Sequence, residues 1–159
     1  MALAFSGREY PSVTVKERHK VSALQTADTL IAKAGIDTGQ DVLSLAAQFD
    51  ISIVRSFAPD QAGYAPSQDV LVISPDVLGN DMRREVAARI AEKILAGARW
   101  NAPSEPVIAA MKARLLVPRE AFERACNIMG GDLDELAEMF GVHPQDVQAL
   151  TSDQIVLNP

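Results

Sequence analysis

The chain has 159 residues, 48% of them hydrophobic and 23% charged, and a formal net charge of −6. The length fits one domain with at most a small addition, and the composition is typical of a soluble globular protein. The acidic balance disfavours nucleic acid or an anionic membrane as the main partner. The single cysteine, Cys126, excludes an internal disulfide and a cysteine-rich zinc site.

The first residues show no targeting signal. Met1–Arg8 lacks the charged leader and the long apolar run of a secretory signal. No stretch of about 18 apolar residues occurs, so we expect no membrane-spanning helix and no membrane partner. We therefore expect a cytoplasmic protein. Residues 1–20 are expected to form an extended or flexible arm, because they combine Pro11 with a charged patch over 16–20.

Two helices and three short strands are predicted next. Apolar residues three or four apart predict a helix over 22–34, with Ser22 as its N-terminal cap and Gly35 at its end. A second helix is predicted from about Val42 to Phe49. Strand patterns over 51–56, 62–65 and 70–73 predict a small three-stranded antiparallel sheet.

The second half of the chain is predicted to be helical. Asp81 can cap a helix that runs to about Ala98, with Ile90 in its apolar row. Further helices are predicted over 107–116, 118–128 and, as two short helices, 133–150. The sequence thus indicates an α+β protein. Its mostly helical part with the small sheet covers residues 21–128, and a helix-turn-helix-like segment and tail cover 129–159.

The order of these elements over roughly 22–150 resembles the ImmA/IrrE family of metallopeptidases. Three motifs carry the resemblance: Ala113–Phe122, Ala62-Gly63-Tyr64 with the strand at 70–73, and Leu136–Val142. The first is similar to the family's string after its active-site helix, the second to the segment before that helix, and the third to its final helix-turn-helix. The resemblance implies a zincin-like fold for 21–128. It also implies a cytoplasmic zinc endopeptidase that cuts a transcriptional repressor, often in a mobile-element or DNA-damage circuit.

The metal-binding residues of that family are missing here. Zincin helices place two zinc-binding histidines four residues apart, with a glutamate between them that activates water. By the resemblance, the histidine positions hold Arg89 and Lys93, the glutamate position holds Ile90, and the third-ligand position holds Val107. A cation cannot ligate zinc, and an isoleucine cannot act as a base. The sequence therefore predicts no catalytic residue, no metal and no cofactor.

Two interpretations remain for the former active-site cleft. Arg89 and Lys93, together with Tyr64, could hold a carboxylate or phosphate group of a ligand. Alternatively, the two cations form a salt-bridged patch on a filled cleft, which is the interpretation that we favour.

The helix-turn-helix-like segment is acidic. After Arg124 the chain contains no lysine or arginine, whereas contacts to DNA phosphates need such cations. We therefore predict that this segment is a packing unit or a protein-binding face, and charge complementarity would favour a basic partner. The predicted protein-binding face consists of Glu135, Glu138, Gln145, Asp146 and Gln148.

These observations support three functions, in order of preference. The first is a non-catalytic, metallopeptidase-like protein that binds a protein partner (a repressor, a toxin or a related peptidase) in a bacterial or phage regulatory circuit. The second is a DNA-binding transcriptional regulator, whose basic residues Arg8, Lys16, Arg18 and Lys20 would supply phosphate contacts. The third is a metal-dependent peptidase with a rebuilt site. The sequence does not indicate an oligomeric state.

Overall fold

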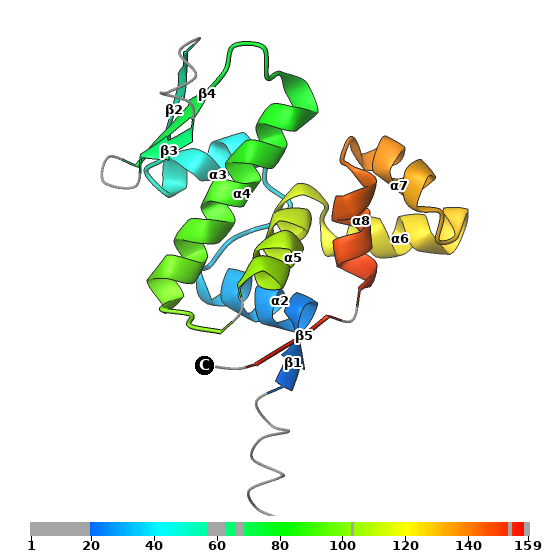
Figure 1. Ribbon diagram of the computed structural model, residues 1–159. Helices are drawn as coiled ribbons and strands as arrows, with labels where there is room; N and C mark the ends of the chain where they lie inside the picture. The colour runs from blue at the N-terminus through cyan, green and yellow to red at the C-terminus, as the bar shows by residue number, and fades with distance from the viewer. Residues whose placement is uncertain (1–19, 57–62, 66–68, 103, 153, 158–159) are drawn as a thin grey trace, which may run out of the picture.

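The computed structural model describes residues 20–56, 63–65, 69–102, 104–152 and 154–157 (Figure 1). Residues 1–19 of the predicted arm lie outside the described residues. The described chain is mostly helical with small sheets, which confirms the α+β class. The helices are α2 (Ala23–Lys33), α3 (Val42–Gln48), α4 (Gly79–Ala98), α5 (Glu105–Leu116), α6 (Arg119–Met129), α7 (Leu133–Phe140) and α8 (Pro144–Thr151). The strands are β1 (Lys20–Ser22), β2 (Ser52–Arg55), β3 (Gly63–Ala65), β4 (Val70–Ile73) and β5 (Ile155–Leu157).

Helix α2 begins where the sequence predicts. The Ser22 hydroxyl accepts a hydrogen bond from the Gln25 N–H at 3.0 Å and so caps the helix. The helix ends at Lys33, and Gly35 follows with a φ of +70°, a conformation that favours glycine. Most of the predicted apolar face is buried, namely Ala23, Ala27, Leu30 and Ile31, whereas Leu24 is half-buried and Ala34 is exposed.

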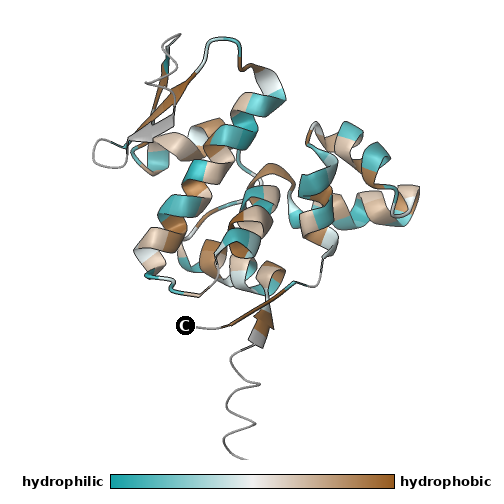
Figure 2. Ribbon diagram, viewed as in Figure 1, coloured by the Kyte–Doolittle hydropathy of each residue, from teal (hydrophilic) through white to brown (hydrophobic). Residues whose placement is uncertain are grey.

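Helix α4 begins earlier than predicted. Its N-cap is Leu78, which makes no side-chain capping bond, and Asp81 lies inside the first turn. The predicted capping role of Asp81 was therefore wrong, although its charge still suits the positive end of the helix dipole. Arg99 ends the helix in the left-handed conformation, with a φ of +53°. Figure 2 shows polar and apolar residues alternating along α4, as expected for a helix with one face on the core.

The sheet formed by β2, β3 and β4 is mixed, not antiparallel. Its strand order is β2-β4-β3, with β3 antiparallel to β4 and β2 parallel to it. The antiparallel prediction was therefore wrong for β2. Strand β4 takes the central position, and its Leu71 and Ile73 are buried. A strand with a neighbour on each edge is shielded from water, which suits the apolar run of β4.

A second, two-stranded sheet was not predicted. Strand β1 pairs antiparallel with β5, with Val21 opposite Val156. The Ala23 N–H donates to the Gln154 carbonyl at 2.6 Å, next to this pairing. Strands of three residues carry too short a pattern to be recognised in the sequence. The pairing places the last described residues beside the start of α2 (Figure 1).

Helix α5 lies at the centre of the fold. It packs against α4, α2 and α8, as Figure 1 shows. Its buried apolar residues are Val107, Ala110, Met111, Ala113, Leu115 and Leu116. The predicted short helices α7 and α8 meet at Gly141, which has a φ of +65°, and Val142 and Val147 beyond it are buried. None of the described helices combines the length and apolar character needed to cross a membrane.

Candidate functional site

The positions that would hold the catalytic glutamate and the third zinc ligand lie in the hydrophobic core. Ile90 on α4 and Val107 on α5 are each 0% exposed and belong to the same buried cluster. Helices α4 and α5 pack on each other, so these two side chains contribute to the interface between helices. Neither position has access to water or to a substrate, because each is fully covered by apolar neighbours.

Arg89 and Lys93 are half-buried on α4, and each makes contacts within the chain. Arg89 Nη1 is 2.7 Å from Glu92 Oε2, three residues later. Lys93 Nζ is 3.2 Å from Asp69 Oδ1 and also donates to the Phe49 carbonyl. About a quarter of each side chain remains exposed. Each of the two cations therefore has its own interaction partners within the chain.

The structure places Tyr64 only by its backbone. It lies in β3, opposite Leu71 of β4. Its side chain, predicted to line the former cleft, lies outside what the structure describes. Among the described residues, no three histidine, cysteine, aspartate or glutamate side chains gather into a group that could hold a metal ion.

Most of the predicted protein-binding face is exposed. Its exposed members are Glu135, Glu138, Gln145 and Gln148. Helix α7 begins at an N-cap, Asp132, whose Oδ1 accepts from the Glu135 N–H at 3.0 Å. The buried face of α7 carries Leu136 and Ala137, which turns its acidic residues outward. We name the exposed residues Asp134, Glu135, Glu138 and Met139 the acidic α7 face; the Met139 residue is 58% exposed.

Asp146 does not belong to this exposed face, which corrects the sequence prediction. It is only 2% exposed, and its carboxylate points toward α4 and α5. Arg84 of α4 donates to it from Nε at 2.7 Å, and Lys112 Nζ of α5 lies 3.3 Å from its other oxygen. The His143 N–H also donates to it, at 3.2 Å. Asp146 therefore ties α8 to the two central helices, because a buried carboxylate needs such partners.

The contacts of Asp146 oppose the effect of its burial. Burial alone would raise the pKa of this carboxyl group. The hydrogen bond from Arg84 and the charge of Lys112, with smaller contributions from the Arg84 charge and the His143 N–H, outweigh it. The pKa of Asp146 is therefore lowered from its ordinary value of 3.8. The carboxylate is charged in the folded protein at neutral pH.

This lowered pKa makes a prediction for acid stability. A carboxyl whose pKa is lower in the folded than in the unfolded state stabilises the fold above the unfolded value, and this stabilisation disappears as the pH falls through the folded value. We expect Asp146→Asn to be less stable than the wild type at neutral pH, with a difference that shrinks below about pH 4. Urea unfolding over a pH series measures this difference. Asp134→Asn, on an exposed residue, should follow the wild-type profile, and a pH-independent loss in Asp146→Asn would contradict the assignment.

A pocket of about 490 Å³ lies next to the acidic α7 face. Its lining residues come from the start of α4, from α7 and from the turn between α7 and α8: Leu78, Asn80, Asp81, Ala137, Glu138, Gly141, Val142 and His143. The His143 Nε2 and Asp81 Oδ1 atoms are 3.1 Å apart across it. Among the described residues that line this α7 pocket there is no lysine or arginine. Sequence reasoning missed the α4 side of the pocket, because Asp81 and His143 are 62 residues apart and nothing local connects them.

No model of a known protein family matches the sequence, and neither does any curated protein. A solved structure, a Mycobacterium tuberculosis transcriptional regulator, is similar with a TM-score of 0.53 and 21% sequence identity. The similarity covers 80% of this chain and 46% of the regulator, so the chain spans less than half of the regulator's length. At this level of identity the similarity concerns the fold alone.

Proposed function

We propose that this protein is a non-catalytic, metallopeptidase-like regulatory protein that binds a basic segment of a protein partner. The binding site would be the acidic α7 face together with the α7 pocket. The observation that carries the proposal is the composition of this pocket. Asp81 and Glu138 contribute two carboxylates to it, while Leu78 at its rim is 63% exposed. Carboxylates beside exposed apolar groups suit the long side chain of a lysine or arginine, whose stem is apolar and whose head is cationic.

The charge distribution supports a protein partner in preference to DNA. The residues Asp134, Glu135 and Glu138 are exposed on α7, and no lysine or arginine follows Arg124 in the sequence. DNA would be repelled by such a surface, since its affinity for proteins depends on cations that neutralise phosphates. A basic protein segment would be attracted and oriented by the same charges.

The non-catalytic part of the proposal has separate support. The resemblance to the metallopeptidase family assigns Ile90 and Val107 to the positions of the catalytic glutamate and a zinc ligand. Both residues are buried in the core. Any catalytic group would therefore have to come from a different side chain at another surface. On this proposal the chain keeps a metallopeptidase-like arrangement of helices and binds a partner without cutting it.

A comparative capture experiment tests this function. The tagged protein is incubated with nuclease-treated lysate of its native host, and retained proteins are identified by mass spectrometry. We expect a stoichiometric partner with a basic segment, and we expect the double substitution Glu135→Lys and Glu138→Lys to abolish its retention by reversing the charge of α7. The double substitution Glu105→Lys and Glu120→Lys, on exposed residues of α5 and α6, makes the same charge change outside this surface and should retain the partner as the wild type does.

The opposite results would reject the proposal. A partner held equally by the wild type and the α7 double variant would place the binding site elsewhere on the molecule. Partners that are retained from untreated lysate but lost after nuclease treatment, together with DNA binding by the purified protein that weakens steeply as salt increases, would favour the alternative of a DNA-binding regulator. That alternative rests on the helix-turn-helix-like arrangement of α7 and α8 and on a fold similar to that of a transcriptional regulator.

A further inference from the structure

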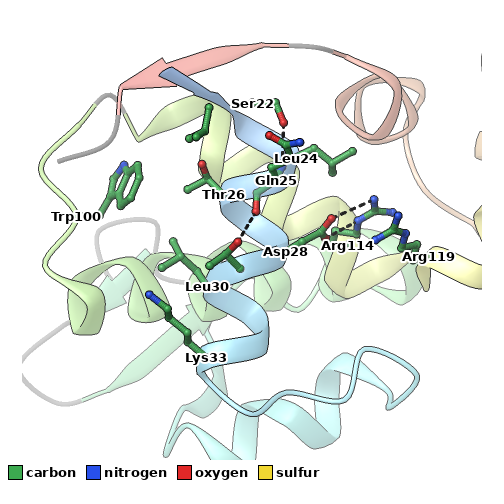
Figure 3. Close-up of a pocket in the computed structure, with 12 residues that line it drawn as sticks. Ser22, Leu24, Gln25, Thr26, Asp28, Leu30, Lys33, Trp100, Arg114 and Arg119 are labelled. Atoms are coloured by element: carbon green, nitrogen blue, oxygen red, sulfur yellow. Dashed lines mark hydrogen bonds and ion pairs between the residues drawn. The ribbon is translucent and has the colours of Figure 1, made fainter. Parts of the chain in front are cut away.

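A groove with a volume of about 840 Å³ runs along the outer surface of α2, away from the acidic α7 face. Figure 3 shows Arg114 and Arg119 on one side of α2 and Trp100 and Lys33 on the other. Residues of α2 itself, among them Gln25 and Thr29, form the floor between these two walls. The volume is within the range of sites that bind small organic molecules.

The groove carries more positive than negative charge. Its charged lining residues are Lys33, Arg114 and Arg119, against a single carboxylate, Asp28. Arg114 donates from Nε to Asp28 Oδ1 at 2.8 Å. Arg119 contacts Glu123 at 3.0 Å, but this pair is largely exposed and therefore screened by water. The charges lining the groove thus leave it cationic although the chain as a whole is acidic.

The groove is also rich in polar atoms that lack partners. Arg114 is only 6% exposed, yet its Nη1 has no hydrogen-bond partner among the described residues. The same holds for the buried Trp100 Nε1 and Thr26 Oγ1. Guanidinium and indole nitrogens can only donate hydrogen bonds, and a hydroxyl can donate as well. Buried polar groups are normally paired, so the unpaired Nη1 of Arg114, a residue that lines the groove, can donate to an oxygen of a bound anion.

We propose that this groove binds an elongated organic anion with acidic groups, carboxylate or phosphate, at two separated positions. One acidic group would bind at Arg114 Nη1 and the Arg119 guanidinium, because Nε and Nη2 of Arg114 already donate to Asp28. The second would bind at the opposite wall, at the Lys33 ammonium group beside the Trp100 ring. The apolar side chains of Leu24 and Leu30, which also line the groove, would contact the carbon chain between the two groups. This site is separate from the proposed protein-binding surface, so either proposal can fail without the other.

Trp100 provides the readout, because it is the only tryptophan in the chain. The full-length protein is titrated with straight-chain dicarboxylates from succinate to azelate, and tryptophan fluorescence is recorded. Calorimetry on the same samples detects any binding that leaves the fluorescence unchanged. We expect at least one dicarboxylate to bind saturably and about tenfold more tightly than acetate, which has only one acidic group. The neutral diamide of the tightest dicarboxylate should not bind.

A parallel titration with glycerol 1,3-bisphosphate shows whether the groove prefers phosphate or carboxylate groups. Saturable binding of the bisphosphate or of a dicarboxylate supports the site.

Variants locate the two ends of the site. Arg119→Gln and Lys33→Gln each remove one exposed cation from a different wall, and each should weaken binding about tenfold. Arg124→Gln removes the same charge from α6 outside the groove and should bind as the wild type. The proposal would be overturned if neither dianion class bound, if acetate or the diamide matched the dianions, or if Arg124→Gln weakened binding as much as Arg119→Gln.

Discussion

Replacement of Asp146 by alanine is expected to lower the free energy of unfolding by about 3 kcal/mol. The substitution removes the carboxylate that Arg84 and Lys112 share, and it leaves both cations without their partner. These cations are about one-fifth exposed, so water can only partly replace the lost contact. The His143 N–H at the start of α8 also loses its acceptor. Urea unfolding at neutral pH measures the loss.

A matched control separates this contact from a general loss of charge. Asp134→Ala removes an exposed carboxylate from α7 and should change the free energy of unfolding by less than about 0.5 kcal/mol. The triple substitution Asp146→Leu, Arg84→Met and Lys112→Met removes all three charges together and should regain part of the stability, because no uncompensated charge stays behind. A loss of stability in Asp146→Ala no larger than in Asp134→Ala would show that the carboxylate does not join the helices.

The second large effect is expected for Ile90→Glu. This substitution introduces a carboxyl group at a position with 0% exposure. Burial of a carboxyl group without a partner should reduce the free energy of unfolding by about 4 kcal/mol. The loss should be smaller in acid, because burial raises the pKa of the new carboxyl and the neutral acid is less costly to bury. Thermal and urea unfolding at two pH values measure both effects.

Ile128→Glu is the control for this second prediction. Ile128 lies on α6 and is 83% exposed, so the same substitution there should leave the melting temperature nearly unchanged. Ile90→Val, which removes one methylene group from the core, should cost about 1 kcal/mol. An Ile90→Glu protein that melts like the wild type would mean that water reaches this position.

Local patterns in the sequence were sufficient to predict most of the helices. Ser22 and Gly35 mark the limits of α2, and Gly141 marks the turn between α7 and α8, because caps and turns depend on neighbouring residues. The parallel pairing of β2 with β4 was missed, since the sequence pattern of a strand does not specify which neighbour it pairs with or in which direction. The three-residue strands β1 and β5 were missed because each is too short to show a period.

The candidate site depended more strongly on contacts between distant segments. The sequence identified Glu135 and Glu138 as exposed acidic residues, since helical spacing separates the two faces of α7. Asp146 was assigned to the same face because its type favours exposure. Its burial depends on Arg84, which is 62 residues away, and on Lys112 of a third helix. The groove along α2 was missed for the same reason, since it combines residues of several helices.

The pairing of β1 with β5 has a mechanical consequence. Lys20 is opposite Leu157, and Ser22 is opposite Ile155, so the first residue of β1 and the last residue of β5 lie at the same end of the ladder. A force that separates these two residues would open the ladder one residue pair at a time, instead of loading all its hydrogen bonds together. The pairing of β1 with β5 would therefore separate at low force. Tension along the chain would next act on α2 and α8, before it reached the buried contacts of α4 and α5.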